Sequence, residues 1–226
     1  MTQRDPSTSL VVAESVLAVT SVTGASISTL GGLFPAETIS ASDDVIARID
    51  ELQFDLGEGP CWDAVASGRP VLEPDLRGRP NGSWPAFSRA ISDDVLAALF
   101  AFPLSVGPLR FGAIDMYDVR PRSLDQGEMT RVTALTAELS RAVLRQAIEE
   151  GGPEESPASV RPRSRRRIHQ ATGFVIDQLD VSASDAELLI RARAFAEGRT
   201  MLEIADDILS NRRRFTARAG EIEDER

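Results

Sequence analysis

The sequence predicts two domains of different class, an α+β domain in front and a small all-α domain behind it. Strand-like and helical stretches alternate up to residue 148, whereas a helical periodicity with repeated cap signals fills residues 164–209. With 226 residues, of which 42% are hydrophobic, the chain can bury one medium core and one small core. We therefore expect an N-terminal domain at 1–148, a linker at 149–163, and a three-helix domain with a C-terminal tail at 164–226.

The first part of the α+β domain shows helix and strand signals in turn. Apolar residues at helical spacing open it, and two strand-like runs then flank a glycine turn, as in a hairpin. A helix follows, and a loop of glycine and proline leads into a short helix and a strand. The expected elements are helix 8–20, strand 24–30, turn 31–32, strand 37–42, helix 43–54, short helix 62–67 and strand 69–73.

The second part of this domain begins with residues 95–118, which are rich in apolar and aromatic residues and predict two antiparallel strands joined through 106–108. A helix capped at 123–126 then runs to about Ile148. Its apolar stripe recurs at nearly heptad spacing, which fits a symmetric homodimer, although packing on its own sheet explains the stripe equally well. The stripe consists of Met129, Val132, Leu135 or Thr136, Leu139, Val143 and Ala147.

Residues 149–163 contain three prolines and two glycines, and their charge changes from acidic to basic. Such a composition is typical of a flexible or extended linker. A rigid rod between the two domains is therefore not expected.

Three short helices are predicted behind the linker. The first has a single apolar stripe at Ile168, Ala171 or Thr172, Val175 and Leu179. The second is expected to begin with a capping box of Ser184 and Glu187, and the third with a capping box of Thr200 and Glu203. The stripes of these two helices are Ala186, Leu189, Ile190 and Ala194, and Ile204, Ala205, Ile208 and Leu209.

This region resembles the ANTAR domains, three-helix modules that bind RNA hairpins in nascent transcripts and prevent premature termination. The resemblance covers residues 165–209. Its marks are Arg167, Ile168, Gln170, Ala171, Gly173, Ala186, Ile190, Arg191, Ala194, Leu202, Ile204 and Ala205. The chain departs from the pattern at Thr172, where the family usually carries lysine, and at Glu187, where an aromatic residue is common.

The resemblance implies an RNA partner and a set of contact residues. Arginines would neutralise phosphates, and polar side chains such as His169 and Gln170 would meet unpaired loop bases. The expected RNA-binding residues are Arg163, Arg165, Arg166, Arg167, His169, Gln170, Gly173 and Arg191.

The front domain resembles the GAF sensor domains found ahead of ANTAR modules in actinobacterial regulators. The matching residues cover roughly 10–148 and include Asp50, Gln53, the loop 57–61, Asp63, Trp84, Gly107, Gly112 and Tyr117. The resemblance implies a central antiparallel sheet with helices on one face and a ligand-sized pocket under the loops on the other face. It also implies a homodimer, but it does not identify the small molecule.

Cys61, Asp63 and Trp84 are the candidates for ligand binding in that pocket. A thiol beside a glycine turn could serve as a redox sensor or a cofactor anchor, and a tryptophan could stack on a planar ligand. Cysteine and tryptophan also commonly fill cores, however, and no basic residue adjoins Cys61 in sequence to lower the pKa of its thiol. We therefore predict no cofactor and leave open an unknown small-molecule ligand.

Charge is divided unevenly along the chain. Residues 1–159 contain 12 arginines and 23 acidic residues, a net charge of −11, whereas residues 160–226 contain 13 and 12, a net charge of +1. Five arginines crowd into residues 161–167, so the local field there is positive. This division favours regulation by masking, in which the acidic domain covers the arginine segment until ligand or RNA competes.

Composition also excludes several kinds of chemistry. All 25 basic residues are arginine, which excludes a lysine phosphate loop and a Schiff-base nucleophile. A single cysteine cannot form an internal disulfide, and together with a single histidine it cannot form the usual zinc site. Because the only histidine, His169, lies outside the sensor region, a histidine-ligated haem in that region is also excluded. No apolar run has the length of a membrane span or a signal peptide. We expect a cytoplasmic protein that binds no metal and no membrane and is not an enzyme.

Two functions from different classes remain. The first is a signal-responsive regulator that binds RNA through its C-terminal helices under the control of the GAF-like domain. The second is a ligand-binding or dimerising adaptor whose ANTAR-like module no longer binds RNA. The arginine cluster favours the regulator, and Thr172 together with the net charge of −10 favours the adaptor.

Overall fold

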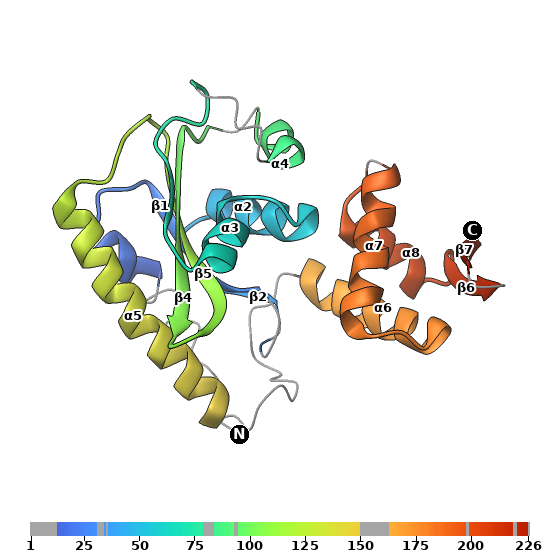
Figure 1. Ribbon diagram of the computed structural model, residues 1–226. Coiled ribbons are helices and arrows are strands. Elements are labelled where there is room, and N and C mark those ends of the chain that lie inside the picture. The colour runs from blue at the N-terminus through green and yellow to red at the C-terminus, as the bar shows by residue number, and fades with distance from the viewer. Residues whose placement is uncertain are drawn as a thin grey trace. The chain divides into compact units, whose positions relative to one another are not determined.

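The computed structural model describes residues 13–30, 34, 36–78, 84–92, 95–149, 163–197, 199–218 and 221–225. It divides into two units, a front unit, Met1–Val160, and a helical unit, Arg161–Arg226 (Figure 1). Within the described ranges, no helix is long and apolar enough to cross a bilayer.

A five-stranded antiparallel sheet forms the centre of the front unit. Its order is β2-β1-β5-β4-β3, and every neighbouring pair is antiparallel. The predicted hairpin in 95–118 is confirmed, with its turn at Gly107 and Pro108, where Gly107 adopts a left-handed φ of 59°. The strands are β1 Gly24–Thr29, β2 Glu37–Ala41, β3 Val71–Glu73, β4 Ala98–Val106 and β5 Leu109–Asp118.

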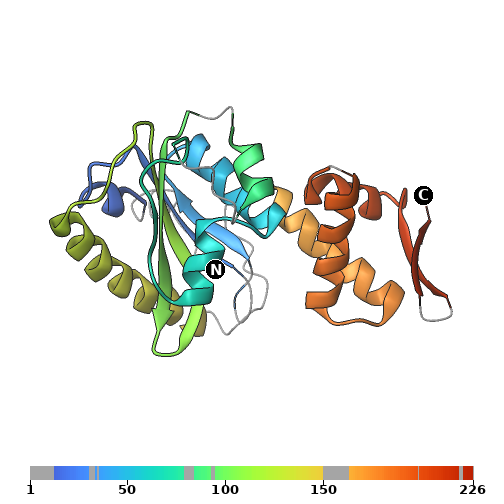
Figure 2. The same ribbon diagram turned by 45° about the horizontal axis from the view of Figure 1, so that its top comes forward.

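Helices cover both faces of this sheet, so the expectation of helices on one face and only loops over the other was wrong. One face carries α5, and the other carries α2 and α3, with α4 packed beside α2 (Figures 1 and 2). The bounds are α2 Asp44–Leu56, α3 Pro60–Ser67, α4 Pro85–Ala90 and α5 Gln126–Glu149. Of the predicted helix 8–20, residues 13–17 are helical, whereas 8–12 and the turn 31–32 lie outside the described residues.

The pleat of the sheet sends alternate side chains into two cores. Phe100 and Phe102 of β4 belong to the core under α5, whereas Leu99 packs with Ile49 of α2 and Phe87 of α4. Side chains of successive strand residues point to opposite faces, so one apolar strand can serve both layers. The nearly unbroken burial of β4 and β5 follows from this arrangement.

The stripe of α5 packs on the sheet of its own chain. Val132 is fully buried, and Met129, Leu135, Leu139, Val143 and Ala147 pack against the same core. Core packing therefore accounts for the nearly heptad spacing, and the homodimer stays a prediction.

The start of α5 is fixed by a reciprocal cap between Asp125 and Glu128. The Glu128 backbone N–H donates to Asp125 Oδ1 at 2.7 Å, and the Asp125 N–H donates to Glu128 Oε2 at 3.0 Å. Glu128 also accepts from the N–H and the hydroxyl of Ser21 and pairs with Arg122. Burial alone would raise the pKa of Glu128, but these hydrogen bonds outweigh it and lower the pKa to about 2.

Over its described residues, the helical unit contains three helices and a hairpin that was not predicted. The helices are α6 Arg163–Leu179, α7 Ala183–Glu197 and α8 Met201–Leu209, and the hairpin strands are β6 Arg214–Arg218 and β7 Glu221–Glu225 (Figure 2). The tail after residue 209 carries few apolar residues, so its strand signal is weak. Phe215 is nevertheless buried, and its N–H donates to Gln178 Oε1 of α6 at 2.9 Å.

The two predicted capping boxes have different outcomes. At α8 the box is present, since Glu203 N–H donates to Thr200 Oγ1 and Thr200 N–H donates to Glu203 Oε2. These bonds from Thr200 lower the pKa of Glu203. At α7 the prediction was wrong, because the helix begins two residues earlier, with Asp185 N–H donating to Ser182 Oγ.

Candidate nucleic-acid interface

Helix α6 has one buried face and one exposed face, as its apolar periodicity predicts. Ile168, Ala171 and Val175 are buried in the helical unit. The exposed face carries residues at spacings of three and four, so they lie along one side of the helix. In order they are Gln170, Gly173, Phe174 and Asp177, with the partly exposed Arg167 one turn before them.

Arg167 lies at the edge of this face and pairs with an acidic residue of α8. Its Nε donates to Asp206 Oδ1, and both side chains are about two-fifths exposed. Ion pairs that water reaches contribute little stability, so a phosphate can compete for the guanidinium. Arg167 is thus held in place and still available.

Arg191, the other predicted phosphate contact whose side chain is described, lies on α7. Its NH2 group donates to Glu187 Oε1 at 2.8 Å, one helical turn away. ANTAR domains commonly have an aromatic residue at the position of Glu187. The substitution therefore supplies Arg191 with a local carboxylate as well as changing the packing.

The remaining predicted RNA contacts all belong to α6. His169 is half-buried, Gln170 and Gly173 are exposed, and a Cβ added to Gly173 would meet nothing within 4 Å. Arg163, Arg165 and Arg166 fall within the first turns of α6, but their side chains lie outside the described part of the chain. The structure brings Arg167, Gln170 and Gly173 onto one face and places Arg191 on another helix.

Thr172, which replaces the lysine that the family usually carries, faces inward. It is only 8% exposed, and its hydroxyl donates to the Ile168 carbonyl at 2.9 Å. Thr172 therefore contributes neither a charge nor a hydrogen-bonding group to the exposed α6 face.

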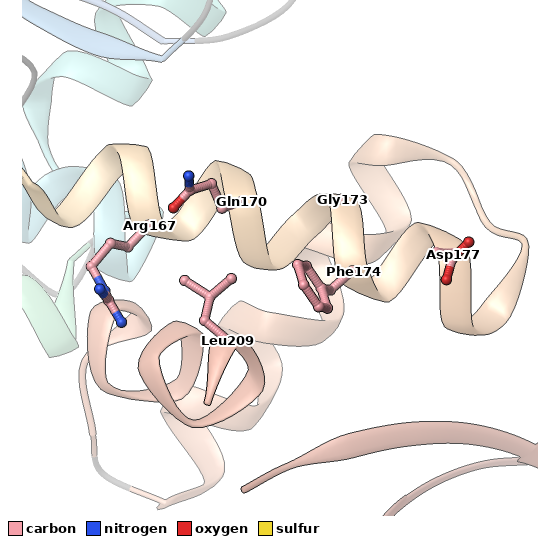
Figure 3. A pocket seen from close by; sticks show the side chains of 6 residues that line it. All are labelled: Arg167, Gln170, Gly173, Phe174, Asp177 and Leu209. Carbon is pink, nitrogen blue, oxygen red and sulfur yellow. The ribbon is translucent and has the colours of Figure 1, made fainter. Parts of the chain in front are cut away.

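A groove between α6 and α8 lies on the same side as this exposed face. It has a volume of about 640 Å³ and is lined by Arg167, Gln170, Gly173, Phe174, Asp177 and Leu209. Leu209 of α8 points toward α6, the Phe174 ring lies beside it, and Arg167 and Asp177 mark the two ends (Figure 3). We call this hollow the α6–α8 groove.

Phe174 and Asp177 are two groove residues that the sequence reasoning missed. The signal that could have found them is their spacing, since they follow Gln170 by four and seven residues and so share its side of the helix. Phe174 is 46% exposed, which is high for a large apolar side chain beside a core.

The three candidates for ligand binding in the front unit lie close to each other. Cys61 of α3 is buried, and its backbone N–H donates to Gln53 Oε1 at 2.9 Å. Trp84 is also buried, and its indole N–H donates to Asp63 Oδ2 at 3.0 Å. Both buried side chains pack as core residues in this structure, and a role in ligand binding stays a prediction.

A buried polar cluster lies between the sheet and α2. Asp50 of α2 accepts from the hydroxyls of Ser26, at 3.1 Å, and Thr38, at 2.8 Å. One turn later, Gln53 donates to Asp115 of β5 at 3.0 Å. All five side chains are buried, so these hydrogen bonds replace the water that polar groups lose on burial.

Comparisons with known proteins treat the two units separately. The family model of the ANTAR domain matches residues 158–209. A search of curated protein sequences found no match.

The front unit is similar to solved structures at low sequence identity. One is a domain of a Sinorhizobium meliloti 1021 protein described as a two-component sensor histidine kinase, with a TM-score of 0.52 at 13% identity over 66% of this chain and 96% of that one. Another is the GAF domain of an Acinetobacter phosphoenolpyruvate-protein phosphotransferase, with a TM-score of 0.49 at 13% identity over 64% and 84%. A third, the GAF domain region of a Geobacter sulfurreducens PCA protein, has a TM-score of 0.48 at 15% identity over 59% and 88%. The first likeness supports the fold alone.

Proposed function

Because residues 158–209 form an ANTAR domain behind a front unit of GAF-like fold, we propose that this protein is a cytoplasmic regulator that binds RNA hairpins in nascent transcripts and prevents their premature termination. The observation that supports it best is the exposed face of α6, where Arg167, Gln170 and Phe174 lie side by side. This face can bind a hairpin loop in three ways. The guanidinium can pair with a phosphate, the amide can hydrogen-bond to a base edge, and the aromatic ring can stack on an unpaired base.

The chemistry separates affinity from specificity. Arginines neutralise phosphates of the stem and the loop without regard to sequence. The deep and narrow major groove of an RNA duplex does not admit side chains, so sequence is read from unpaired loop bases. Gln170 and His169 would contribute to that reading from α6.

The test is a titration of the intact protein with an RNA hairpin at several salt concentrations. If Arg163, Arg165, Arg166, Arg167 and Arg191 each neutralise about one phosphate, log affinity should fall against log salt with a slope of roughly −3.5 to −4.5. Arg167→Ala should reduce the magnitude of the slope by somewhat less than one. Gln170→Ala should change which hairpins bind and leave the slope unchanged. Binding that does not depend on salt would contradict the proposal.

The adaptor remains the second candidate, and Thr172 is the observation that favours it. Thr172 supplies no positive charge where the family usually carries lysine, which favours the adaptor, whereas the exposed Arg167 on the same helix favours the regulator. Thr172→Lys distinguishes the two functions. Binding that is undetectable at low salt in the natural chain and appears only in this variant would establish the adaptor.

We also propose that the front unit controls RNA binding in response to a small molecule. The charge division of −11 and +1 supports this, because an acidic front unit lowers the affinity of its own chain for RNA. The intact protein should therefore bind RNA less tightly than residues 161–226 alone. Equal affinities would exclude electrostatic control by the front unit.

A further inference from the structure

The α6–α8 groove combines an apolar platform with a carboxylate. Phe174 is nearly half exposed, and with Leu209 it forms the apolar part of the groove (Figure 3). Every nucleobase has a flat π-face, and unpaired bases stack on exposed aromatic rings in RNA-binding proteins. Phe174 therefore suits one base taken out of a hairpin loop.

Asp177 restricts which bases suit the groove. It lies one helical turn after Phe174 and is exposed, and no hydrogen bond or ion pair engages its carboxylate among the described residues. An ionised carboxylate only accepts hydrogen bonds. Adenine, cytosine and guanine each carry an amino group that can donate to it, whereas uracil presents its single N–H between two carbonyl oxygens. Those oxygens would be repelled by the carboxylate.

Arg167 gives the groove a polarity. It is held near α8 by Asp206, at the end opposite Asp177 (Figure 3). A base enters with its sugar and phosphate attached, and the phosphate is attracted to the guanidinium end. The amino edge of the base is then left to the carboxylate end.

We propose that the α6–α8 groove receives one unpaired loop base that carries an exocyclic amino group, stacked on Phe174 with its amino edge toward Asp177. The inference rests on the proposed RNA-binding function and adds a base-selective site to it. Phe174 supplies affinity for any base, and Asp177 excludes uracil.

The experiment uses the intact protein and a pool of stem-loop RNAs with a fixed stem and a fully randomised loop. The enriched loops are sequenced for the natural chain, and the affinity and salt dependence of its best hairpin are measured. Phe174→Leu keeps an apolar side chain but removes the ring, Phe174→Tyr keeps the ring, and Asp177→Asn replaces the carboxylate with an amide that both donates and accepts. Thermal unfolding checks that each variant is folded.

Phe174→Leu is expected to weaken binding by about 5- to 150-fold, which corresponds to the loss of one stacked base. The salt slope should not change, since no charge is altered. Phe174→Tyr should bind like the natural chain. Asp177→Asn should admit uracil at one loop position from which the natural chain excludes it.

Three outcomes are decisive. If the natural chain binds with a steep salt slope and Phe174→Leu binds equally well, the inference is overturned and the RNA-binding function stands. If uracil is as frequent as the other bases at every loop position of the natural chain, the role of Asp177 is overturned. If the natural chain binds no hairpin at low salt, the function and the inference fail together.

Discussion

At the scale of single residues, Arg167 is already paired with a carboxylate, so a phosphate of RNA has to compete with that carboxylate for the guanidinium. Asp206 holds its guanidinium in place, as Glu187 holds that of Arg191. The pairing of Arg167 was not visible in the sequence, because Asp206 is 39 residues away. Glu187 and Arg191 are four residues apart, so their pairing follows from helical spacing. The positive charge of the free RNA-binding surface is therefore smaller than its number of arginines indicates, because two of these arginines are paired with carboxylates.

Asp206→Asn should tighten RNA binding by about two- to fivefold, because the competing carboxylate is removed and an exposed ion pair is weak. The measurement is a titration with one hairpin at low and at moderate salt. Glu138→Gln removes the same charge from an exposed position in the front unit and serves as the control. An equal gain in both variants would show that net charge, and not the release of Arg167, is responsible.

Glu128 makes the front unit sensitive to acid. Its pKa is about 2 in the folded protein, below the ordinary value of 4.5, so its stabilisation is complete above pH 4.5 and is lost as the pH falls toward 2. The loss amounts to about 3 kcal/mol for a shift of this size. Glu128→Gln should be less stable at neutral pH and should lack this part of the pH dependence.

Both tryptophans, Trp62 and Trp84, belong to the front unit, so their fluorescence reports its unfolding selectively. Urea unfolding of the natural chain and of Glu128→Gln should be compared at several pH values between 2 and 7. Parallel pH profiles for the two proteins would contradict the assignment.

At the scale of elements, the hairpin β6–β7 depends on a buried ionic network. Arg213 is 1% exposed, and its NH2 group lies 2.7 Å from Glu197 Oε1 of α7. Glu197 also pairs with Arg193 and Arg199. One carboxylate thus serves three arginines, while Arg213 enters the interior with the start of the hairpin.

This arrangement predicts unequal effects for the two partners. Glu197→Gln removes a carboxylate that pairs with the buried Arg213 guanidinium and with two further arginines, and should cost about 3 kcal/mol. Arg213→Met should cost about 1 kcal/mol, because Glu197 keeps Arg193 and Arg199. Hydrogen exchange of the α7 and α8 amides in the intact protein measures both losses. A larger loss for Arg213→Met would contradict this account.

Most elements could be predicted because their signals are local. The apolar spacing of α6 and the capping box of Thr200 and Glu203 depend on neighbours within a few residues, and both are confirmed. The missed helix α4 depends on a distant group instead. Glu58 of the loop before α3 accepts from the Ala86 and Phe87 N–H groups and so caps a helix that has no side-chain cap of its own.

The candidate site could be predicted in part for the same reason. The face of Arg167 and Gln170 follows from helical periodicity, but the groove requires Leu209 of α8 as its second wall. The interior position of Thr172 follows from how α6 packs, and the sequence left Ala171 and Thr172 as alternatives for one stripe position. Both are buried, so the stripe is wider than expected.

At the scale of the whole molecule, the division into two units predicts separable folding. A glutamate-specific protease should cut first between Glu149 and Glu155, where the sequence has the composition of a linker. Tryptophan fluorescence of the front unit should not change after the cut, because Trp62 and Trp84 report on contacts within that unit. First cuts within 13–148 would contradict the division.

We expect the buried polar cluster under α2 to limit how fast a small-molecule signal binds between this helix and the sheet. A small molecule that enters between the sheet and α2 must first separate Asp50 from Ser26 and Thr38, and Gln53 from Asp115. Opening then precedes the encounter, so the association rate stops rising once ligand is abundant. Above that concentration, the opening rate of the front unit, and not the concentration of the small molecule, limits how fast the response begins.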